Sequence, residues 1–234
     1  MAGRHPARSQ ADGADRNKKV IRRADGFPID RFAVIERAWE GQTVVCIGGG
    51  PSVTPSAVDS IRGRARVIAI NNAYILAPWA EMCYFADTRW WEWHQNQPVF
   101  KSFAGHKVTI ENTGLLIKDE AVFMLHNLNN EQLSESPNGI HTGSNGGYQA
   151  VNIAVLSGAK RIILLGYDMR FPGGKSHWHG GHPVKNPADH YTMYAGKFAT
   201  MLPQLKRLGV EVINATPGSA IKCFPFMDLN EALG

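Results

Sequence analysis

The sequence predicts a single α/β domain with a doubly wound, mostly parallel sheet of the Rossmann type. Continuous apolar runs alternate with helical segments, a pattern typical of strands that helices bury on both faces. One apolar strand runs directly into three glycines at 48–50, a turn that lets backbone N–H groups approach a phosphate closely. With 234 residues, the chain is long enough to bury the core of one such domain, which we place at residues 26–234.

The apolar runs also predict where the individual elements lie. Apolar side chains at Ile29, Phe32, Ile35 and Trp39 have a helical spacing and predict a packing helix over 29–39. The expected strands follow at 43–47, 67–70, 82–85, 107–110, 121–125, 161–165 and 210–213, with helices at 55–61, 146–157 and 189–208. Ligands of such open sheets bind beyond the carboxyl ends of the strands, so the residues that follow each strand are the candidates for a site.

Positive charge is concentrated at the N-terminal end of the chain. Residues 1–25 contain seven Arg and Lys against three Asp, which accounts for +4 of the net charge of +5. Almost no apolar residues precede Val20, so this segment is predicted to be a disordered basic arm. The arm could be a solvated tail, or it could contact DNA or another acidic partner by neutralising phosphates.

Cysteine use and hydropathy bear on the cellular compartment. Cys46, Cys83 and Cys223 lie far apart in apolar or strand-like surroundings and are predicted to be buried thiols rather than a disulfide framework or a zinc site. No apolar run approaches the roughly 20 residues of a membrane span, and the N-terminus lacks the apolar stretch of a signal peptide. We therefore expect a cytoplasmic protein, which could form a homo-oligomer.

The glycine turn is the clearest candidate for a phosphate site. It comprises Gly48, Gly49, Gly50, Pro51 and Ser52. The dinucleotide fingerprint G-x-G-x-x-G is incomplete, because Val53 stands at the third glycine and Asn71 and Asn72 replace the acidic residue that binds the ribose in NAD enzymes. NAD is therefore disfavoured. Three glycines exceed what a plain strand-to-helix turn needs, so close approach to a phosphate is the favoured interpretation.

Polar residues follow two further strands. Asn71 and Asn72 end the strand at 67–70, where their carboxamides could bind a base edge or a sugar hydroxyl, or form an Asx turn. Asp87 follows the strand at 82–85 and is another ligand-binding candidate. The tryptophans at 90, 91 and 93 could wall a pocket, or they could pack their helix against the sheet.

A second helix N-terminus is predicted to accept an anion. Ser144 or Asn145 would cap the helix that begins near residue 146, and Gly146 and Gly147 would open its first turn. The free N–H groups and the helix dipole at such an end favour a negatively charged ligand. These four residues are therefore predicted to bind the same ligand as the glycine turn.

Titratable and charged residues cluster after the strand at 161–165. Arg170 could bind a phosphate or pair with Asp168, and we favour the ion pair, with a ligand role for at least one member. The glycine-rich loop that follows carries His177, His179 and His182. Zinc is the weaker interpretation, because the helical i,i+4 spacing and supporting carboxylates of common zinc sites are absent. A histidine above a phosphate-binding cleft is suited to deprotonate an acceptor hydroxyl, so a general base is favoured.

In their order along the chain, the motifs resemble those of the bacterial family 42 sialyltransferases and of related phage-encoded and 6-hydroxymethylpterin diphosphokinase-like proteins. The motifs are residues 48–52, 71–72, the helix from 146, 166–168, 176–182 and 216–220, so the likeness covers roughly residues 41–225. The resemblance implies that His182 is the general base, and the last motif adds Ser219 as a nucleotide-binding candidate. The residues that it implies for a CMP-sugar are Gly48, Gly50, Pro51, Ser52 and Asn71.

The chain departs from the sialyltransferase pattern at two places. Gly49 stands where those enzymes have an asparagine, and Met169 and Arg170 occupy the positions of the tyrosines that hold the donor phosphate. The resemblance therefore leaves the donor open. The sialyltransferases need no metal for chemistry, and this sequence likewise lacks an Asp-x-Asp pair that could hold one. The D-x-R-W-W and S-H-W segments resemble phage or prophage proteins.

From these observations we expect a metal-independent glycosyltransferase that uses a nucleotide-sugar as co-substrate and needs no other cofactor. The acceptor would be a nucleic acid or a glycan. His182 would take its proton, with Asp168 and Arg170 completing the catalytic group and Arg170 neutralising the leaving phosphate. Two alternatives stay open: an ATP- and Mg²⁺-dependent pyrophosphokinase acting on a pterin-like alcohol, and a non-catalytic nucleotide- or DNA-binding phage protein.

Overall fold

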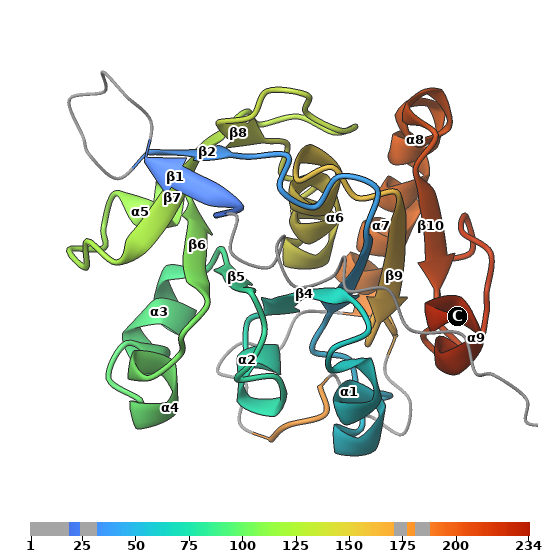
Figure 1. The fold of residues 1–234 in the computed structure, drawn as a ribbon, viewed down its shortest axis with the longest axis horizontal. Helices are drawn as coiled ribbons and strands as arrows, with labels where there is room; N and C mark the ends of the chain where they lie inside the picture. The colour runs from blue at the N-terminus through green and yellow to red at the C-terminus, as the bar shows by residue number, and fades with distance from the viewer. Residues whose placement is uncertain (1–18, 24–31, 171–176, 181–187) are drawn as a thin grey trace, which may run out of the picture.

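The computed structural model describes residues 19–23, 32–170, 177–180 and 188–234. Within these ranges, a parallel sheet lies between two layers of helices (Figure 1). Its strands are β3 (Thr43–Ile47), β4 (Arg66–Ile70), β5 (Met82–Phe85), β6 (His106–Ile110), β7 (Val122–Asn127), β8 (Gly139–Ile140), β9 (Arg161–Leu165) and β10 (Glu211–Asn214). They pair in the order β10-β9-β3-β4-β5-β6-β7-β8, and every pairing is parallel. The predicted Rossmann-like fold is confirmed.

The core forms because the central strands bury side chains on both faces. In β3, Val44 and Cys46 face one layer while Val45 and Ile47 face the other, and all four are fully buried. One face is covered by α1 (Pro55–Ile61), α2 (Ala73–Leu76), α3 (Thr88–His94), α4 (Pro98–Lys101) and α9 (Leu229–Leu233). The other is covered by α6 (Gly146–Leu156), the 3-10 segment η3 (Phe198–Met201) and α8 (Leu202–Leu208). The short α5 (Glu111–Gly114) packs beside β6 and β7, and α7 (Ala188–Lys197) leads into η3.

The segment predicted as a helix at 29–39 contains a strand instead. Ala33–Ile35 forms β2, which pairs antiparallel with β1 (Ile21–Arg23), whereas residues 29–31 lie outside the described residues. Ala33 and Ile35 are buried and Val34 between them is half-buried, an alternation that suits a strand. So short an apolar segment fits either period, and the pairing with β1 decides between them.

The first strand also bears on the predicted basic arm at 1–25. Residues 1–18 and 24–25 lie outside the described residues, but Val20 and Ile21 are buried in the core on one face of the sheet. The described end of this segment, residues 19–23, therefore belongs to the folded domain rather than to a free tail. The proposed contact of the arm with DNA stays a prediction.

The helix predicted at 189–208 is divided into three pieces. These pieces are α7, η3 and α8, and Pro203 lies in the first turn of α8. Proline lacks the backbone N–H that a continuous helix needs, and its ring clashes with the preceding turn, so a new helix begins there. Gly209 then ends α8 in a left-handed conformation, with φ of 62°.

The order of the strands creates a crevice beside β3. From β3 the chain proceeds outward through β4 to β8 on one side, whereas β9 and β10 lie on the other side. The chain after β3 leads to α1 on one face of the sheet, whereas the chain after β9 leads to η3 and α8 on the other, and ligands of open α/β sheets bind at such a point. The topology places the glycine turn and residues 166–168 at this crevice.

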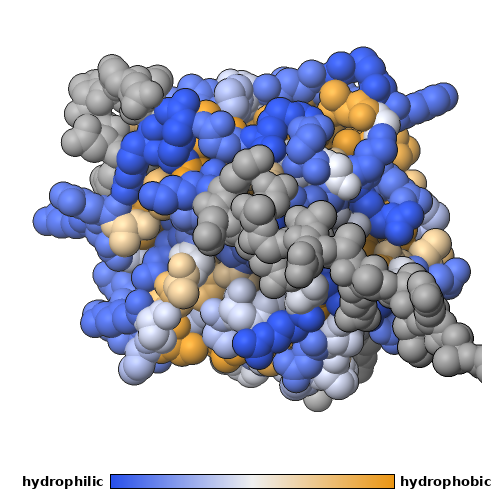
Figure 2. All heavy atoms as spheres, viewed as in Figure 1, coloured by the Kyte–Doolittle hydropathy of each residue, from blue (hydrophilic) through white to orange (hydrophobic). Residues whose placement is uncertain are grey.

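The apolar residues and the cysteines are mostly inside the protein, and its visible surface is largely polar. Over the part of the chain that the structure describes, no helix combines the length and apolar character that crossing a bilayer requires. The three cysteines are free thiols, Cys46 and Cys83 buried and Cys223 half-buried. The face seen in Figure 2 is mostly hydrophilic, with apolar side chains in small, separate patches.

Candidate functional site

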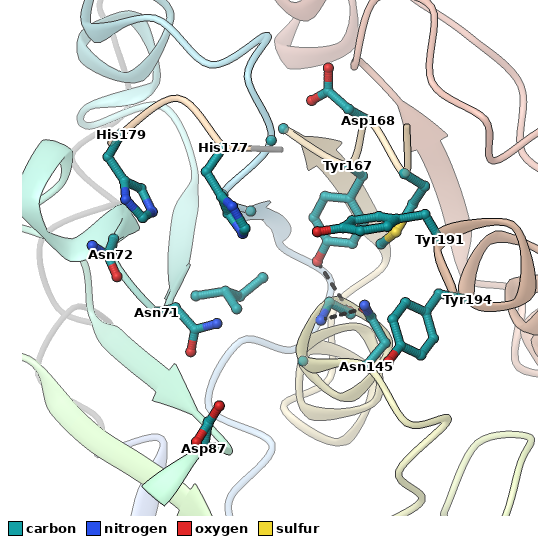
Figure 3. Close-up of a pocket in the computed structure, with 18 of the residues that line it drawn as sticks. Asn71, Asn72, Asp87, Asn145, Tyr167, Asp168, His177, His179, Tyr191 and Tyr194 are labelled. Carbon is teal, nitrogen blue, oxygen red and sulfur yellow. Dashed lines mark hydrogen bonds between the residues drawn. The ribbon is translucent and has the colours of Figure 1, made fainter. Parts of the chain in front are cut away.

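A cavity of about 210 Å³ lies at the carboxyl ends of β3, β4, β5 and β9, in the predicted crevice. In Figure 3, Asn71, Asn72 and Asp87 lie on one side of it, and Tyr191, Tyr194 and Asn145 lie on the other. The predicted site residues that line it are Gly48, Gly49, Gly50, Asn71, Asn72, Asp87, Ser144, Asn145, Gly146, Gly147 and Asp168. The fold thus brings together the segments after the four strands β3, β4, β5 and β9 and the start of α6, as the sequence predicts for a single site.

The three glycines of the turn differ in their contacts with the end of β9. The N–H groups of Gly48 and Gly50 donate to the carbonyl oxygens of Leu165 (2.8 Å) and Gly166 (2.9 Å). A Cβ on either glycine would collide with the Gly166 carbonyl oxygen. Both glycines are therefore required by close packing of the turn on the end of β9. Packing thus accounts for Gly48 and Gly50 without a ligand, and the close approach of the turn to a phosphate stays a prediction.

All three glycines of the turn line the cavity, and Gly49 is the one of them whose added Cβ would meet no backbone atom. A Cβ added there would lie 3.0 Å from Cδ2 of His177, a side chain that also lines the cavity. Its carbonyl accepts a hydrogen bond of 3.1 Å from the Trp178 N–H, which ties the histidine loop to the turn. Within the described part of the chain, the Gly49 N–H donates no hydrogen bond and can serve a ligand.

Asp168 supports the glycine turn through a hydrogen bond with Ser52. Its Oδ2 accepts a 2.7 Å hydrogen bond from the Ser52 hydroxyl, and its side chain points toward the glycine turn in Figure 3. Only 2% of Asp168 is exposed, and this burial raises the pKa of its carboxyl group, although hydrogen bonds from Ser52 and the charge of Arg170 act in the opposite direction. Asp168 thus supports the turn through Ser52, while its other carboxyl oxygen, Oδ1, is buried without a hydrogen-bond partner among the described residues, and Asp168 also lines the cavity.

Replacing Asp168 with Asn is expected to change how stability depends on pH. Because the folded-state pKa is raised, the contribution of Asp168 to stability is fully present below its ordinary pKa of 3.8 and is lost as pH rises through the folded-state value. The free energy of unfolding of the wild type minus that of Asp168→Asn should therefore fall as pH increases over this window. Urea unfolding at a series of pH values measures the difference. Asp59→Asn, at an exposed position, is the control for loss of a surface charge, and an equal slope in that variant would contradict the assignment.

Three other predicted site residues lie away from the cavity. Arg170 is exposed with its guanidinium over Gly218, and within the described residues it forms no ion pair with Asp168, so the predicted pair is wrong. Ser219 is buried, and its hydroxyl donates to the Tyr167 carbonyl at 2.6 Å. Pro51, like Ser52, does not line the cavity. His182 lies outside the described residues.

The two asparagines after β4 have different environments. Asn71 has a left-handed backbone, with φ of 50°, and its side-chain Oδ1 is buried without a hydrogen-bond partner among the described residues. A buried acceptor in a cavity wall without a partner is a candidate for binding a ligand donor. Asn72 instead uses its Oδ1 to accept a 2.7 Å hydrogen bond from the indole of Trp90. Both carboxamides line the cavity.

The tryptophan cluster packs its helix rather than walling the cavity. Trp90 and Trp91 are buried in α3 and stack on Phe85, at ring-centroid distances of 4.8 Å and 5.7 Å. Trp93 is 49% exposed. Asp87 caps α3 by accepting from the Arg89 N–H at 2.9 Å, and it also lines the cavity. The packing alternative is therefore confirmed for Trp90 and Trp91.

The N-terminus of α6 is directed at the cavity but is largely capped. Asn145 accepts hydrogen bonds from the N–H groups of Gly147 (2.8 Å) and Tyr148 (3.1 Å). Ser144, with φ of 58°, accepts from the Lys197 ammonium at 3.2 Å. In the described part of the chain, the Gly146 N–H donates to no protein group, so it is the donor left for a ligand at this helix end.

Two tyrosines complete the cavity, and the sequence analysis did not identify them. Tyr191 and Tyr194 project from α7, with ring centroids 6.3 Å apart, and the Tyr191 hydroxyl points into the cavity in Figure 3. The sequence signal that could have identified them is their three-residue spacing inside a predicted helix, because this spacing places both side chains on one helix face. Both lie across the cavity from Asn71 in Figure 3, in a chain that lacks tyrosines at 169 and 170.

The charge of the site is unusual for a nucleotide cleft. Among the described residues that line it, the ionisable side chains are acidic, histidine or tyrosine, and none is Lys or Arg. His177 and His179 line the cavity with ring centroids 5.1 Å apart. The residues that the structure describes contain no group of three or more His, Cys, Asp or Glu arranged to hold a metal ion. No protein-family model matches the chain, and no curated protein was found to be similar to it.

Proposed function

We propose that the protein is a glycosyltransferase that takes a nucleotide-sugar donor in this cavity and uses a histidine as general base without a catalytic metal. The observation that carries the proposal is the donor set at the switch point of the sheet. It consists of the Gly49 and Gly146 N–H groups, the end of α6 and the hydroxyls of Tyr191 and Tyr194. Such uncharged donors suit one or two phosphates, whereas sites for ATP place Lys, Arg or Mg²⁺ against the β- and γ-phosphates.

The same donors would act most strongly during the reaction. As the acceptor hydroxyl attacks the anomeric carbon, the bond from that carbon to the phosphate oxygen breaks and negative charge grows on the leaving phosphate. Hydrogen-bond donors and a helix N-terminus that are already in place stabilise this charge without having to reorganise. The acceptor proton passes to a histidine of the loop at 177–182, of which His177 and His179 line the cavity.

The test is a thermal-shift screen of the purified protein against CMP, CDP, UDP, GDP, ATP and NAD, each with Mg²⁺ and with EDTA. A nucleotide that binds the native state stabilises it by about 2.7 kcal/mol at a hundred times its Kd. We expect a nucleoside mono- or diphosphate to raise Tm equally in Mg²⁺ and EDTA, and the corresponding nucleotide-sugar to release that nucleotide slowly on incubation, with water taking the sugar in place of the acceptor hydroxyl. A shift with ATP only in Mg²⁺ would favour the pyrophosphokinase, and no shift would favour a non-nucleotide role.

A pair of asparagines provides a matched control for this screen. Asn71 and Asn129 both have left-handed backbones, with φ of 50° and 46°, so replacement by Ala strains the backbone similarly at both positions. Only Asn71 of the two lines the cavity. We expect Asn71→Ala to lose most of the ligand-induced rise in Tm and Asn129→Ala to keep it. Equal rises in the two variants would place the nucleotide elsewhere.

A further inference from the structure

The hydrogen bond between Trp90 and Asn72 determines which way the Asn72 carboxamide faces. An indole N–H can only donate, so the atom 2.7 Å from the Trp90 Nε1 must be the oxygen of Asn72 and not its nitrogen. This holds although oxygen and nitrogen of an amide are otherwise hard to distinguish. The Nδ2 donors of Asn72 are therefore the polar atoms left for the cavity, and among the described residues they have no acceptor.

Trp90 is held rigidly enough to impose this orientation. Trp90 is 5% exposed, and its ring stacks on Phe85 and His94 at ring-centroid distances of 4.8 Å and 4.2 Å. His94 is itself anchored by a 2.7 Å hydrogen bond between its Nδ1 and the Tyr74 hydroxyl. Burial lowers the pKa of His94 to about 4, so the ring stacked on Trp90 is neutral near neutral pH. The indole therefore has little freedom to follow a rotation of Asn72.

Asn71 presents the complementary group beside it. Its buried Oδ1 has no partner among the described residues and can accept, whereas Asn72 offers N–H donors. A ligand that satisfies both must present a donor next to an acceptor. In a sheet of this type, the end of the strand next to the glycine turn is where the ribose hydroxyls bind, and here that strand is β4. Vicinal hydroxyls can donate to one carboxamide and accept from the other.

We propose that Trp90 is a positioning residue that orients Asn72 so that Asn71 and Asn72 together recognise the 2′,3′-diol of a ribonucleotide. The inference rests on the proposed function only in taking the ligand to be a nucleotide. It makes the site selective for ribonucleotides over 2′-deoxyribonucleotides. Trp90 acts on this selectivity through Asn72 and does not touch the ligand.

The test is a double-mutant cycle on nucleotide affinity. Calorimetric Kd values are measured for CMP, UDP and GDP and for their 2′-deoxy counterparts, with the wild type, Trp90→Phe, Asn72→Ala and the double variant. We expect the wild type to favour the ribonucleotide that binds by about tenfold, the equivalent of one good hydrogen bond. Each single variant should lose most of this preference, and Trp90→Phe should have no further effect in the Asn72→Ala background.

Two controls separate positioning from damage to the fold. Trp91→Phe removes the same indole N–H from the neighbouring buried tryptophan, which stacks on Phe85 but does not bond Asn72, and it should keep the ribonucleotide preference. In NMR spectra without ligand, the Trp90 indole proton should exchange faster with solvent in Asn72→Ala than in the wild type, which checks the hydrogen bond directly.

The outcomes distinguish this inference from the proposed function. Binding without a ribonucleotide preference, or a Trp90→Phe effect that persists in full beside Asn72→Ala, would overturn the positioning role and leave the glycosyltransferase proposal standing. If no nucleotide binds the wild type, both proposals are wrong. If nucleotides bind with the expected coupling but no nucleotide-sugar is turned over, the diol site stands and the transferase proposal is overturned.

Discussion

Replacing Gly50 with Ala is expected to destabilise the protein by about 3 kcal/mol, at the upper end of what overpacking typically costs. An added Cβ would collide with Oδ2 of Asp168 and with the carbonyl oxygen of Gly166. Neither can move easily, because one is a buried carboxylate held by Ser52 and the other is backbone at the end of β9. The free energy of unfolding, measured by urea denaturation with a fixed m value, checks this expectation.

Gly49→Ala is the matched control, one residue away. There the added Cβ meets only the ring of His177, at 3.0 Å, and a side chain in a loop can shift by a few tenths of an ångström. We expect a small change in stability but weaker nucleotide binding, because the methyl group enters the cavity beside the free Gly49 N–H. If Gly49→Ala were as destabilising as Gly50→Ala, the division of the turn into packing and ligand-facing glycines would be wrong.

Replacing His182 with Ala is expected to lower the rate of sugar transfer by about 10²–10⁴-fold, the usual contribution of a general base. A base contacts the acceptor hydroxyl and not the donor, so the Kd for the nucleotide should stay unchanged. His182 lies outside the described residues, and the assignment comes from the sequence resemblance. Initial transfer rates together with nucleotide Kd values measure both effects.

The histidines that line the cavity provide the comparison for this variant. His177 lies against Gly49, so His177→Ala is expected to weaken donor binding more than it lowers the turnover of bound donor. His179→Ala tests the remaining position on the loop. Retained transfer in His182→Ala, with loss in His177→Ala or His179→Ala at unchanged donor affinity, would assign the base to that residue instead.

The central strands could be predicted from the sequence because each carries its own evidence. Runs such as 43–47 and 161–165 are apolar at every position after the first, which in a chain of alternating elements indicates burial on both faces. The segment at 29–39 lacks such evidence. Its apolar residues fit a helix or a strand, and the pairing of Ala33–Ile35 with Ile21–Arg23 decides the outcome across a gap in sequence.

The location of the site was predictable for the same reason, but the roles of its residues were not. Strand-ending glycines and asparagines indicate a crevice, since the carboxyl ends of parallel strands share one edge. No local pattern shows that Asp168 binds Ser52 behind the turn, or that Arg170 lies over Gly218. Those contacts join segments more than 40 residues apart.

The sequence by itself therefore determined the sheet, its glycine turn and the edge at which the cavity lies, because hydrophobic periodicity and glycine placement act over a few neighbouring residues. Only the tertiary structure decided that Gly48 and Gly50 pack on the end of β9, while the Gly49 N–H has no acceptor among the described residues. It likewise brought Tyr191 and Tyr194 to the site and set Trp90 against Asn72. These outcomes depend on which distant segments meet, and that is settled by packing of the whole chain rather than by any local pattern.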